Sequence, residues 1–593
     1  MNKLSQTLIQ TLALIVIVTP IMAATPIPGL QMSTQEGTFI IPSTNYSPRE
    51  QGNLTASNTI PSQENQFTTN SFAQFSLGTP LSPSSNTASK ACGEFHTNYI
   101  LFRPADASNT TSQPIVGGAS PQQLYQRFNI PENGGVASAQ AHGIIGIIAI
   151  GSDPTLMSDL NTYSAYYGLP LVTNKNFLML NAPNQSGAAM TQGEQQDVNA
   201  EADLDVEMVH AMAPQAKIVV FCARSLNGGG GNNVPNALTY AGSYVNENGG
   251  GEVSCSMGAE YGYGDPIGAT GYSVKNYPNV AYVASTGDDG SFTSIPAALP
   301  NVIAAGGMSI PVQANSPVSP WCDIFVGVTQ PSGSADLYNV YNTVLTHSSQ
   351  DAQSVETYYN NIINRIYQND GLSTSVIGIQ CGNGGFSLQQ APSYQTNVLA
   401  TTPNLVGPLD PSEYGVSGAG LIQMRATPDI SFSSDPECGV SIYSNGEWSI
   451  SGGTSVSAPA ISGMINASGV AFCKNSNDSF TNKILTNIYS NFQNTTSDFI
   501  LDDVTNIPTT TQTIPAFGPA SLKITPPSVS SYAISIDLYN QLKMGQEYTG
   551  QAVSPPLYSY TYLNYSRKAN SGYNIATGTG APYGYGCFQS PSA

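Results

Sequence analysis

The chain has 593 residues, with 17 Lys and Arg against 37 Asp and Glu, for a formal net charge of −20. Charged residues make up 9% of the chain, whereas an ordinary soluble domain carries about 25%. The clustered basic side chains that bind nucleic acid or an anionic membrane surface are therefore lacking. Because 40% of the residues are hydrophobic, the chain can build a large core, and disorder throughout is excluded.

The first 24 residues have the pattern of a secretory signal peptide. Lys3 precedes an apolar run over residues 8–22, and the small residues Ala23 and Ala24 follow it. The run is short for a membrane span, although an uncleaved N-terminal anchor is the alternative reading. We expect a secreted or cell-surface protein with no integral membrane span after signal removal.

Sequons and cysteines agree with export but do not establish it. Eight Asn-x-Ser/Thr sequons occur, among them Asn466, yet a chain rich in Asn, Ser and Thr produces several by chance. The eight cysteines are scattered, without the spacing of a zinc site. Cys322 and Cys381 bracket an apparent insertion and are the preferred disulfide pair, whereas Cys255 lies in an apolar segment that favours a buried free thiol.

Residues 25–115 are rich in Ser, Thr, Asn, Gln and Pro, with weak periodicity. This composition predicts an extended or loosely folded N-terminal segment, which is either a short pro-segment or a stalk. From Ser120 onwards the pattern changes, because PQQLYQRFNI has the form of a helix that begins with proline.

Buried strands are predicted by four continuous apolar runs, at residues 143–151, 216–223, 280–286 and 301–307. Helical patterns, such as those at residues 198–212 and 233–246, alternate with them. Alternating strands and helices predict an α/β fold with a mostly parallel sheet flanked by helices.

Two regions interrupt this alternation and are interpreted as surface insertions. Residues 323–372 contain a helical-looking stretch, QDAQSVETYYNNIINRIYQ. Residues 506–566 are rich in Pro, Ser, Thr and Tyr and precede a Gly-rich end.

An acidic helical pattern, GEQQDVNAEADLDVEMVHAMAP, runs over residues 193–214. Glu201 and Asp205 lie four residues apart, so both fall on one helical face beside a stripe of apolar residues. Two carboxyl groups close together on a half-buried helix raise one pKa, which suits a general base or acid. The alternative is an acidic, solvated helix start, and we assign Asp203 and Glu207 to that role.

The segment SGGTSVSAPAISGMI, residues 451–465, places Ser455 between a glycine-rich turn and a small-residue helix that begins through Pro459. A serine at such a junction is held rigidly near the helix N-terminus, which favours developing negative charge. The GTSxSAP pattern is typical of subtilase-type serine peptidases, but none of the four histidines has the setting of their catalytic base.

Together these motifs resemble the sedolisin family of serine-carboxyl peptidases, in which Glu replaces the catalytic His on a subtilisin-like fold. The resemblance rests on PQQLYQRFNI, EADLDVEMVHAMAP, VSCSMGAE, ASTGDDG, GNGGFS, RATPDISFSSDP and SGGTSVSAP, which follow one another in the family's order. It implies a peptidase domain over residues 116–593, including the two insertions.

The resemblance also assigns catalytic roles. Ser455 would be the nucleophile and Glu201 its general base and later acid. Asp205 would orient Glu201 and share its proton, and Asp288, in protonated form, would donate to the oxyanion.

Substrate binding is implied for Ser256, Met257 and Gly258, whose backbone would pair with an extended peptide. The expected partners are protein or peptide substrates, and we expect a monomer.

A calcium site is implied near the C-terminus. Asp503, the Val504 carbonyl, Asn570, Gly572 and Asn574 resemble the family's ligands, with Asn574 in place of an Asp. The loss of one formal charge weakens the site, and acid weakens it further.

The function these features imply is that of a secreted, acid-acting serine-carboxyl endopeptidase that forms a Ser acyl-enzyme. The N-terminal segment is shorter than the family's folded pro-domain, so self-inhibition before secretion is not implied. The alternative is a catalytically weak or inactive cell-surface glycoprotein that uses the peptidase fold as a scaffold.

Overall fold

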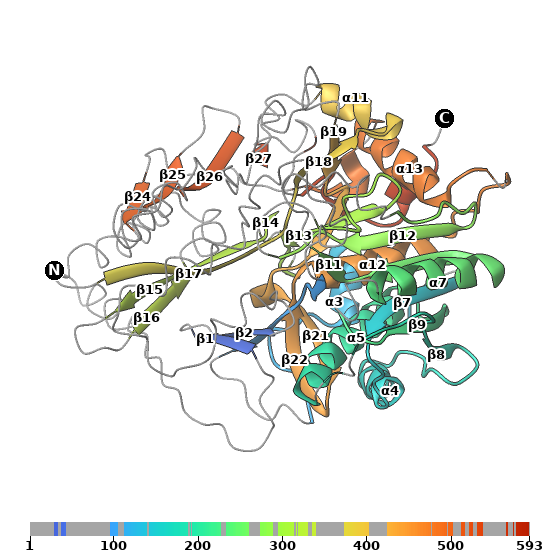
Figure 1. Ribbon diagram of the computed structural model, residues 1–593, viewed down its shortest axis with the longest axis horizontal. Coiled ribbons are helices and arrows are strands. Elements are labelled where there is room, and N and C mark those ends of the chain that lie inside the picture. The colour runs from blue at the N-terminus through green and yellow to red at the C-terminus, as the bar shows by residue number, and fades with distance from the viewer. Residues whose placement is uncertain are drawn as a thin grey trace.

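Figure 1 shows the fold in a computed structural model of the chain. The structure describes residues 29–33, 37–42, 95–104, 112–138, 142–187, 190, 192–226, 233–259, 273–288, 294–313, 316, 318–329, 335–339, 373–401, 424–475, 477–494, 496–501, 512–515, 521–525, 531–537, 565–566, 573 and 577–591.

A central sheet of eight strands organises the molecule, in the order β14-β13-β12-β10-β7-β9-β8 with β20 beside β13. All pairings are parallel except that of β14 with β13. The strands are β7 (Ile144–Ile150), β8 (Phe177–Asn181), β9 (Lys217–Ala223), β10 (Gly251–Cys255), β12 (Val280–Ser285), β13 (Ile303–Ser309), β14 (Ser319–Pro320) and β20 (Ile430–Ser433).

Helices cover both faces of this sheet, which explains why its strands are continuous apolar runs. The helices of the described structure are α3 (Pro121–Arg127), α4 (Leu156–Tyr167), α5 (Gln192–Met212), α7 (Asn233–Glu247), α11 (Ser393–Thr401), α12 (Thr454–Ala467) and α13 (Phe480–Asn494). Of these, α5, α7, α12 and α13 contact strands of the central sheet. In β7, Ile144 and Ile148 pack in one core with α7, whereas Ile145 and Ile147 pack on the other face with α4 and α5. The predicted α/β class, with a mostly parallel sheet flanked by helices, is confirmed.

Part of the polar N-terminal segment forms strands that are built into the rest of the molecule. A five-stranded antiparallel sheet has the order β1-β2-β4-β22-β21, and β3 pairs with β11. These strands are β1 (Gly29–Ser33), β2 (Gly37–Pro42), β3 (Phe95–Thr97), β4 (Ile100–Pro104), β11 (Met257–Ala259), β21 (Val440–Ser444) and β22 (Glu447–Gly452). Tyr99, Ile100 and Leu101 lie in the main core, so the expected boundary near residue 115 does not coincide with the edge of the packed structure.

The two expected insertions contain antiparallel strands. In the first, the order is β16-β15-β17, and the register places Cys322 opposite Cys381. The disulfide between them stays a prediction, and the helical-looking stretch lies outside the described residues. The strands of the two regions are β15 (Cys322–Thr329), β16 (Ala335–Asn339), β17 (Ser373–Cys381), β24 (Gln512–Pro515), β25 (Ser521–Thr525), β26 (Ser531–Asp537) and β27 (Tyr565–Ser566).

Short strands complete the described structure. They are β5 (Glu132–Asn133), β6 (Val136–Ala137), β18 (Gly385–Gln390), β19 (Met424–Thr427), β23 (Phe499–Ile500) and β28 (Ala581–Pro582).

Among the described residues, no helix is long and apolar enough to cross a membrane.

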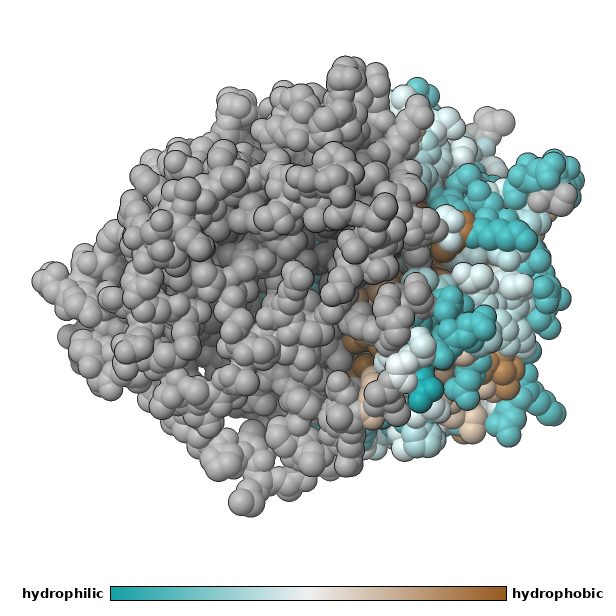
Figure 2. Space-filling model, viewed as in Figure 1, coloured by the Kyte–Doolittle hydropathy of each residue, from teal (hydrophilic) through white to brown (hydrophobic). Residues whose placement is uncertain are grey.

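Large exposed hydrophobic side chains are few among the described residues. They are Val116, Tyr166, Leu171 and Tyr583. The described part of the face in Figure 2 is mostly hydrophilic, with small separate hydrophobic spots.

The predicted free thiol Cys255 and the sequon residue Asn466 are both buried. Cys255 is a buried free thiol, as expected. Asn466, which heads a sequon, is fully buried, and its side-chain nitrogen donates to the His142 carbonyl and to Glu252. A glycan cannot be attached to this nitrogen in the folded protein.

Candidate active site

Four elements bring the predicted catalytic residues together. Glu201 and Asp205 lie on α5, and Ser455 lies on α12, which packs against α5. Ser256 follows the end of β10, and Asp288 lies three residues after β12 ends. The site therefore sits at the carboxyl ends of parallel strands, where open α/β sheets bind their ligands.

Ser455 is the second residue of α12, so the predicted position at the start of a helix is found. The preceding Gly453 has φ of 90°, a left-handed conformation that favours glycine. Pro459 does not begin the helix as expected but lies inside it. Since proline has no N–H to donate to the carbonyl four residues earlier, the Ser455 carbonyl is left for another donor. The Ser256 hydroxyl oxygen lies 3.4 Å from it.

The Ser455 hydroxyl and the Glu201 carboxyl are in direct contact. Ser455 Oγ donates to Glu201 Oε2 at 3.0 Å, within the range expected of a nucleophile and its base. The same hydroxyl lies 3.2 Å from the Ser256 carbonyl oxygen. Both side chains are buried, at 0% and 2% exposure.

Burial raises the pKa of Glu201 well above its ordinary value, and the charge of Asp205 adds to the effect. The hydrogen bond from Ser455 and the backbone N–H of Asn98 act in the opposite direction. A carboxyl group with a raised pKa can take the serine proton under less acidic conditions than a free glutamate.

Asp205 lies one helical turn after Glu201 on α5 and is hydrogen-bonded to Ser256. The Ser256 hydroxyl donates to Asp205 Oδ1 at 2.6 Å, whereas Glu201 Oε1 and Asp205 Oδ2 have no hydrogen-bond partner. The two carboxyl groups therefore act on each other through charge. Burial raises the pKa of Asp205 well above its ordinary range, and the Ser256 hydrogen bond partly offsets this. Asp205 positions Ser256, whose carbonyl in turn contacts Ser455.

Asp288 lies beside the residues that precede the nucleophile. Its Oδ1 accepts hydrogen bonds from the Thr454 backbone at 2.8 Å and from the Thr454 hydroxyl at 2.7 Å. Its Oδ2 is so close to Gly453 that a Cβ there would lie 2.5 Å away. Asp288 is thus fixed by one oxygen, with the other turned toward the loop in front of Ser455.

The chain's own residues 95–98 run through this site. Strand β3 pairs antiparallel with β11, with Met257 opposite Thr97 and Gly258 opposite residue 96. The backbone of Met257 and Gly258 therefore pairs with a segment of the chain itself, in a register that continues to Ala259 and does not include Ser256. Pairing of these residues with a substrate stays a prediction.

Asn98 brings that segment to the nucleophile. The Ser455 backbone N–H donates to the Asn98 carbonyl oxygen at 2.8 Å. A Cβ at Gly453 would lie 2.4 Å from this oxygen, so Gly453 gives room to both the Asn98 carbonyl and Asp288. The backbone N–H of Ser455 is therefore occupied by a carbonyl group of the chain itself.

Asn98, Thr454 and Ser285 were not predicted as site residues. Asn98 belongs to the polar segment that was expected to be loosely folded, and no local pattern marks it. Its role depends on contacts with residues 285 and 455, which lie far away in the sequence.

Two acidic residues of α5 contradict the expectation of a solvated helix start. Asp203 and Glu207 are fully buried, and burial raises the pKa of each well above its ordinary range. The Tyr443 backbone N–H donates to both carboxyl oxygens of Glu207, at 3.3 and 3.1 Å. The expectation was wrong because α5 is covered by α4, α12 and β21, so none of its faces is left to solvent there.

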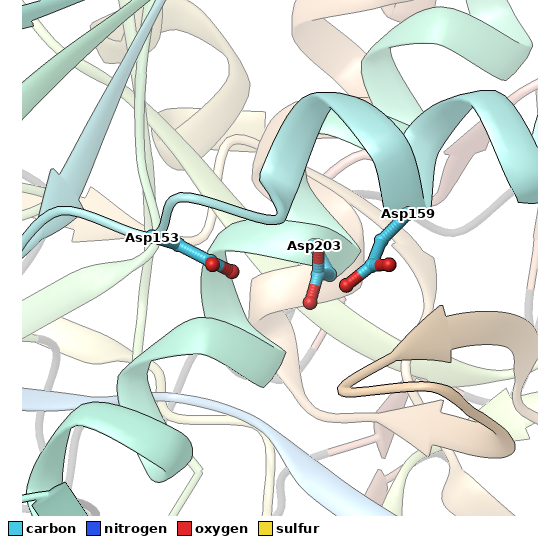
Figure 3. A group of neighbouring side chains, drawn as sticks. All are labelled: Asp153, Asp159 and Asp203. Atoms are coloured by element: carbon cyan, nitrogen blue, oxygen red, sulfur yellow. The ribbon is translucent and has the colours of Figure 1, made fainter.

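Asp153, Asp159 and Asp203 form a separate acidic group, in which one oxygen of each lies within 4.8 Å of the others. Figure 3 shows Asp203 on α5 between the carboxyl groups of Asp153 and Asp159. The Thr155 backbone and hydroxyl donate to Asp153 Oδ1, each at 2.8 Å. The donor set consists of hard oxygen atoms of the type that bind Ca²⁺, and protons would neutralise the group equally well.

The predicted calcium ligands lie elsewhere. Asp503, Val504, Asn570, Gly572 and Asn574 are outside the described residues. The acidic group around Asp203 shares no residue with that set.

No protein-family model and no curated protein matches the chain. Among solved structures, it is similar to a Pseudomonas sedolisin, a serine-carboxyl proteinase complexed with pseudo-iodotyrostatin. The identity is 18% and the TM-score 0.42, over 75% of this chain and 100% of that one.

It is also similar to an S41 psychrophilic protease, at 13% identity and a TM-score of 0.29, over 59% of this chain and 84% of that one. A third likeness is to the epidermin leader peptide processing serine protease from Staphylococcus aureus, at 13% identity and a TM-score of 0.26, over 63% and 75%.

Proposed function

We propose that the chain is a secreted, acid-acting serine-carboxyl endopeptidase that hydrolyses peptide bonds in protein substrates as a monomer. The observation that carries the proposal is the 3.0 Å hydrogen bond from Ser455 Oγ to Glu201 Oε2, in a buried site. A serine beside a carboxyl group of raised pKa at a helix N-terminus has the chemistry of an activated nucleophile.

The proposed reaction begins with attack of Ser455 Oγ on the substrate carbonyl carbon while Glu201 takes the hydroxyl proton. The oxygen of the tetrahedral intermediate is stabilised by the Ser455 backbone N–H and by protonated Asp288. Glu201 then gives its proton to the leaving amine, and the ester on Ser455 remains. Water attacks this ester with Glu201 again acting as base, which releases the acid product and restores the serine.

Low pH supports the proposed reaction through Asp288. Asp288 must be protonated to donate a hydrogen bond, because an ionised carboxylate only accepts. Burial and the charge of Asp205 raise the pKa of Glu201, so we expect the two carboxyl groups to keep one proton above the ordinary carboxyl value of about 4, while the other carboxyl group is free to act as base.

Cleavage of a denatured protein between about pH 2 and 5 tests the proposal, over the range where carboxyl groups are protonated. Ser455→Ala and Glu201→Gln should each lower the rate by at least about a hundredfold, which is typical for loss of a nucleophile or its base.

Two matched controls should keep the wild-type rate. Ser462→Ala removes a buried hydroxyl of the same helix that only donates to its own helix, at 2.8 Å from the Ala458 carbonyl. Glu207→Gln removes a buried carboxyl group of α5 outside the site. Equal rates in the wild type and in both site variants would end the assignment.

The alternative of a catalytically weak or inactive surface glycoprotein has one observation in its favour. The chain's own residues 95–97 pair with β11, the Asn98 carbonyl accepts from the Ser455 N–H, and Ser455 is fully buried. A serine-directed peptide aldehyde separates the two functions. Labelling of Ser455 after incubation in acid supports the peptidase, and no labelling in any condition supports the scaffold.

Calcium binding is proposed on the sequence alone, through Asp503, Val504, Asn570, Gly572 and Asn574. Elemental analysis of dialysed protein should find calcium, and Asp503→Asn should lower its content. An active, stable wild type without metal would reject this part of the proposal.

A further inference from the structure

Asn98, whose carbonyl oxygen accepts the hydrogen bond from the Ser455 N–H, has its side chain among small polar residues. Asn98 Nδ2 donates to the Ser285 hydroxyl at 2.7 Å, and this contact is buried. A Cβ at Gly258 would lie 2.2 Å from Ser294 Oγ and 3.3 Å from Asn98 Nδ2. The missing side chain of Gly258 therefore leaves room for Ser294 and for the carboxamide, and the Ser294 hydroxyl donates to the Ser285 carbonyl at 3.3 Å.

The backbone of the segment identifies which peptide bond faces the nucleophile. Residues 95–97 pair antiparallel with β11, and the next carbonyl, that of Asn98, accepts the hydrogen bond from the Ser455 N–H. A carbonyl oxygen in that position is the one that becomes the oxyanion. The bond that follows it joins Asn98 to Tyr99.

The side chain three residues before Asn98, that of Phe95, lies in an apolar pocket. Phe95 is 3% exposed and belongs to a hydrophobic core with Ala259, Tyr282 and Ile295. The segment thus places an aromatic side chain in an apolar pocket and a carboxamide in a polar one, with β11 holding the backbone between them.

We propose that the pocket of Ser285, Ser294 and Gly258 selects substrates with asparagine before the scissile bond, and that Asn98–Tyr99 is the first bond the enzyme cuts. The inference rests on the proposed peptidase function. Ser455 Oγ would attack the Asn98 carbonyl carbon, and the Tyr99 nitrogen would leave with the proton from Glu201. Water would then release Asn98 as a free carboxylate.

The first test follows the full-length chain in acid by mass spectrometry of its N-termini. The wild type should produce a new N-terminus at Tyr99, and Ser455→Ala should stay whole at this bond. Asn98→Leu should slow the cut at least about tenfold, the value of one lost hydrogen bond. A new N-terminus at Asn98 or elsewhere, with Asn98–Tyr99 intact, overturns the inference.

The second test does not depend on the folding of an Asn98 variant. Processed wild-type enzyme is given peptides with the sequence Phe-His-Thr-Xaa-Tyr, in which Xaa is Asn, Gln, Asp, Ala or Leu. The kcat/KM for Asn should exceed that for Ala and Leu at least about tenfold. The kcat/KM for the Asp peptide should approach that for the Asn peptide only at a pH where the Asp side chain is protonated, because a protonated carboxyl group can donate a hydrogen bond to the Ser285 hydroxyl.

Ser285→Ala should reduce the ratio of Asn to Ala kcat/KM about tenfold, whereas Ser462→Ala should leave this ratio unchanged. A purely structural role of Ser285 would lower both rates and keep the ratio. Ser455-dependent cleavage of all five peptides at equal rates overturns the inference but keeps the peptidase. No cleavage of any peptide or denatured protein overturns the proposed function itself.

Discussion

Asp429 and a group of four acidic residues of α5 (Glu201, Asp203, Asp205 and Glu207) are all buried, but their charges are neutralised in different ways. Asp429 forms an ion pair with Arg425, with Nη1 to Oδ1 at 2.5 Å, and Tyr489 and the Ala304 N–H also donate to it. In the described part of the chain, no Lys or Arg forms such a pair with Glu201, Asp203, Asp205 or Glu207.

The difference shows in the direction of the pKa shifts. Burial alone would lower the pKa of Arg425, but the charge of Asp429 more than offsets this and holds Arg425 charged. In α5, burial raises the pKa of each of the carboxyl groups of Glu201, Asp203, Asp205 and Glu207. The first region is therefore stable with its charges paired, whereas the second is stable when protons remove its charges.

Breaking the ion pair should have the largest effect. Arg425→Met leaves the Asp429 charge buried without a partner, which should lower the free energy of unfolding by about 3–5 kcal/mol. Urea unfolding at pH 5 measures this.

The additional change Asp429→Asn serves as the control for that experiment. It removes the charge but keeps an acceptor for the Ala304 N–H, so the double variant should regain part of the loss. If the double variant is less stable than Arg425→Met, the unpaired charge is not the cause.

The acidic residues of α5 should make the protein less stable as the pH rises. Their pKa is raised in the folded state, so the folded state binds more protons than the unfolded state above the ordinary carboxyl value of about 4. Stability is then fully present below that pH and is lost as the pH rises through the raised values. The expected slope is about 1.4 kcal/mol per pH unit for each retained proton.

Asp203→Asn sharpens this prediction. The amide is neutral at every pH, so the variant should lose less stability than the wild type between pH 4 and 8, measured by urea unfolding. Asp478→Asn changes an exposed carboxyl group and should leave the slope unchanged. A protein that becomes more stable toward pH 8 would contradict the account of α5.

The smallest expected effect concerns the coupling within α5. The charge of Asp205 raises the pKa of Glu201, so Asp205→Asn should move the acidic limb of the kcat/KM profile to lower pH, by at most about one unit. Ser256→Ala, which removes the hydrogen bond to Asp205 but no charge, is the comparison. An unchanged limb in Asp205→Asn would show that charge does not couple the two groups.

Local pattern was sufficient to predict the parallel strands, helix α5 and the helix that begins near Ser455, because apolar periodicity and glycine-rich turns are local features. It was also sufficient to pair Glu201 with Ser455 through the family resemblance. It could not predict the burial of Asp203 and Glu207, since the elements that cover α5 lie far away in the chain.

The structure of the segment around Asn98 was predicted wrongly for a similar reason. Its polar surroundings predicted a loosely folded region, but residues 95–97 pair with residues 257–259, and residues 100–102 pair with residues 450–452. Pairing between such distant residues leaves no trace in the local composition.

That pairing has a consequence for the lifetime of the cleaved protein. After a cut between Asn98 and Tyr99, the N-terminal fragment would still be attached at two places, through β3 on β11 and through β2 on β4. The two attachments belong to one fragment, so each keeps the other at high effective concentration. Release of the fragment, more than bond cleavage, would then determine how soon a second substrate reaches Ser455.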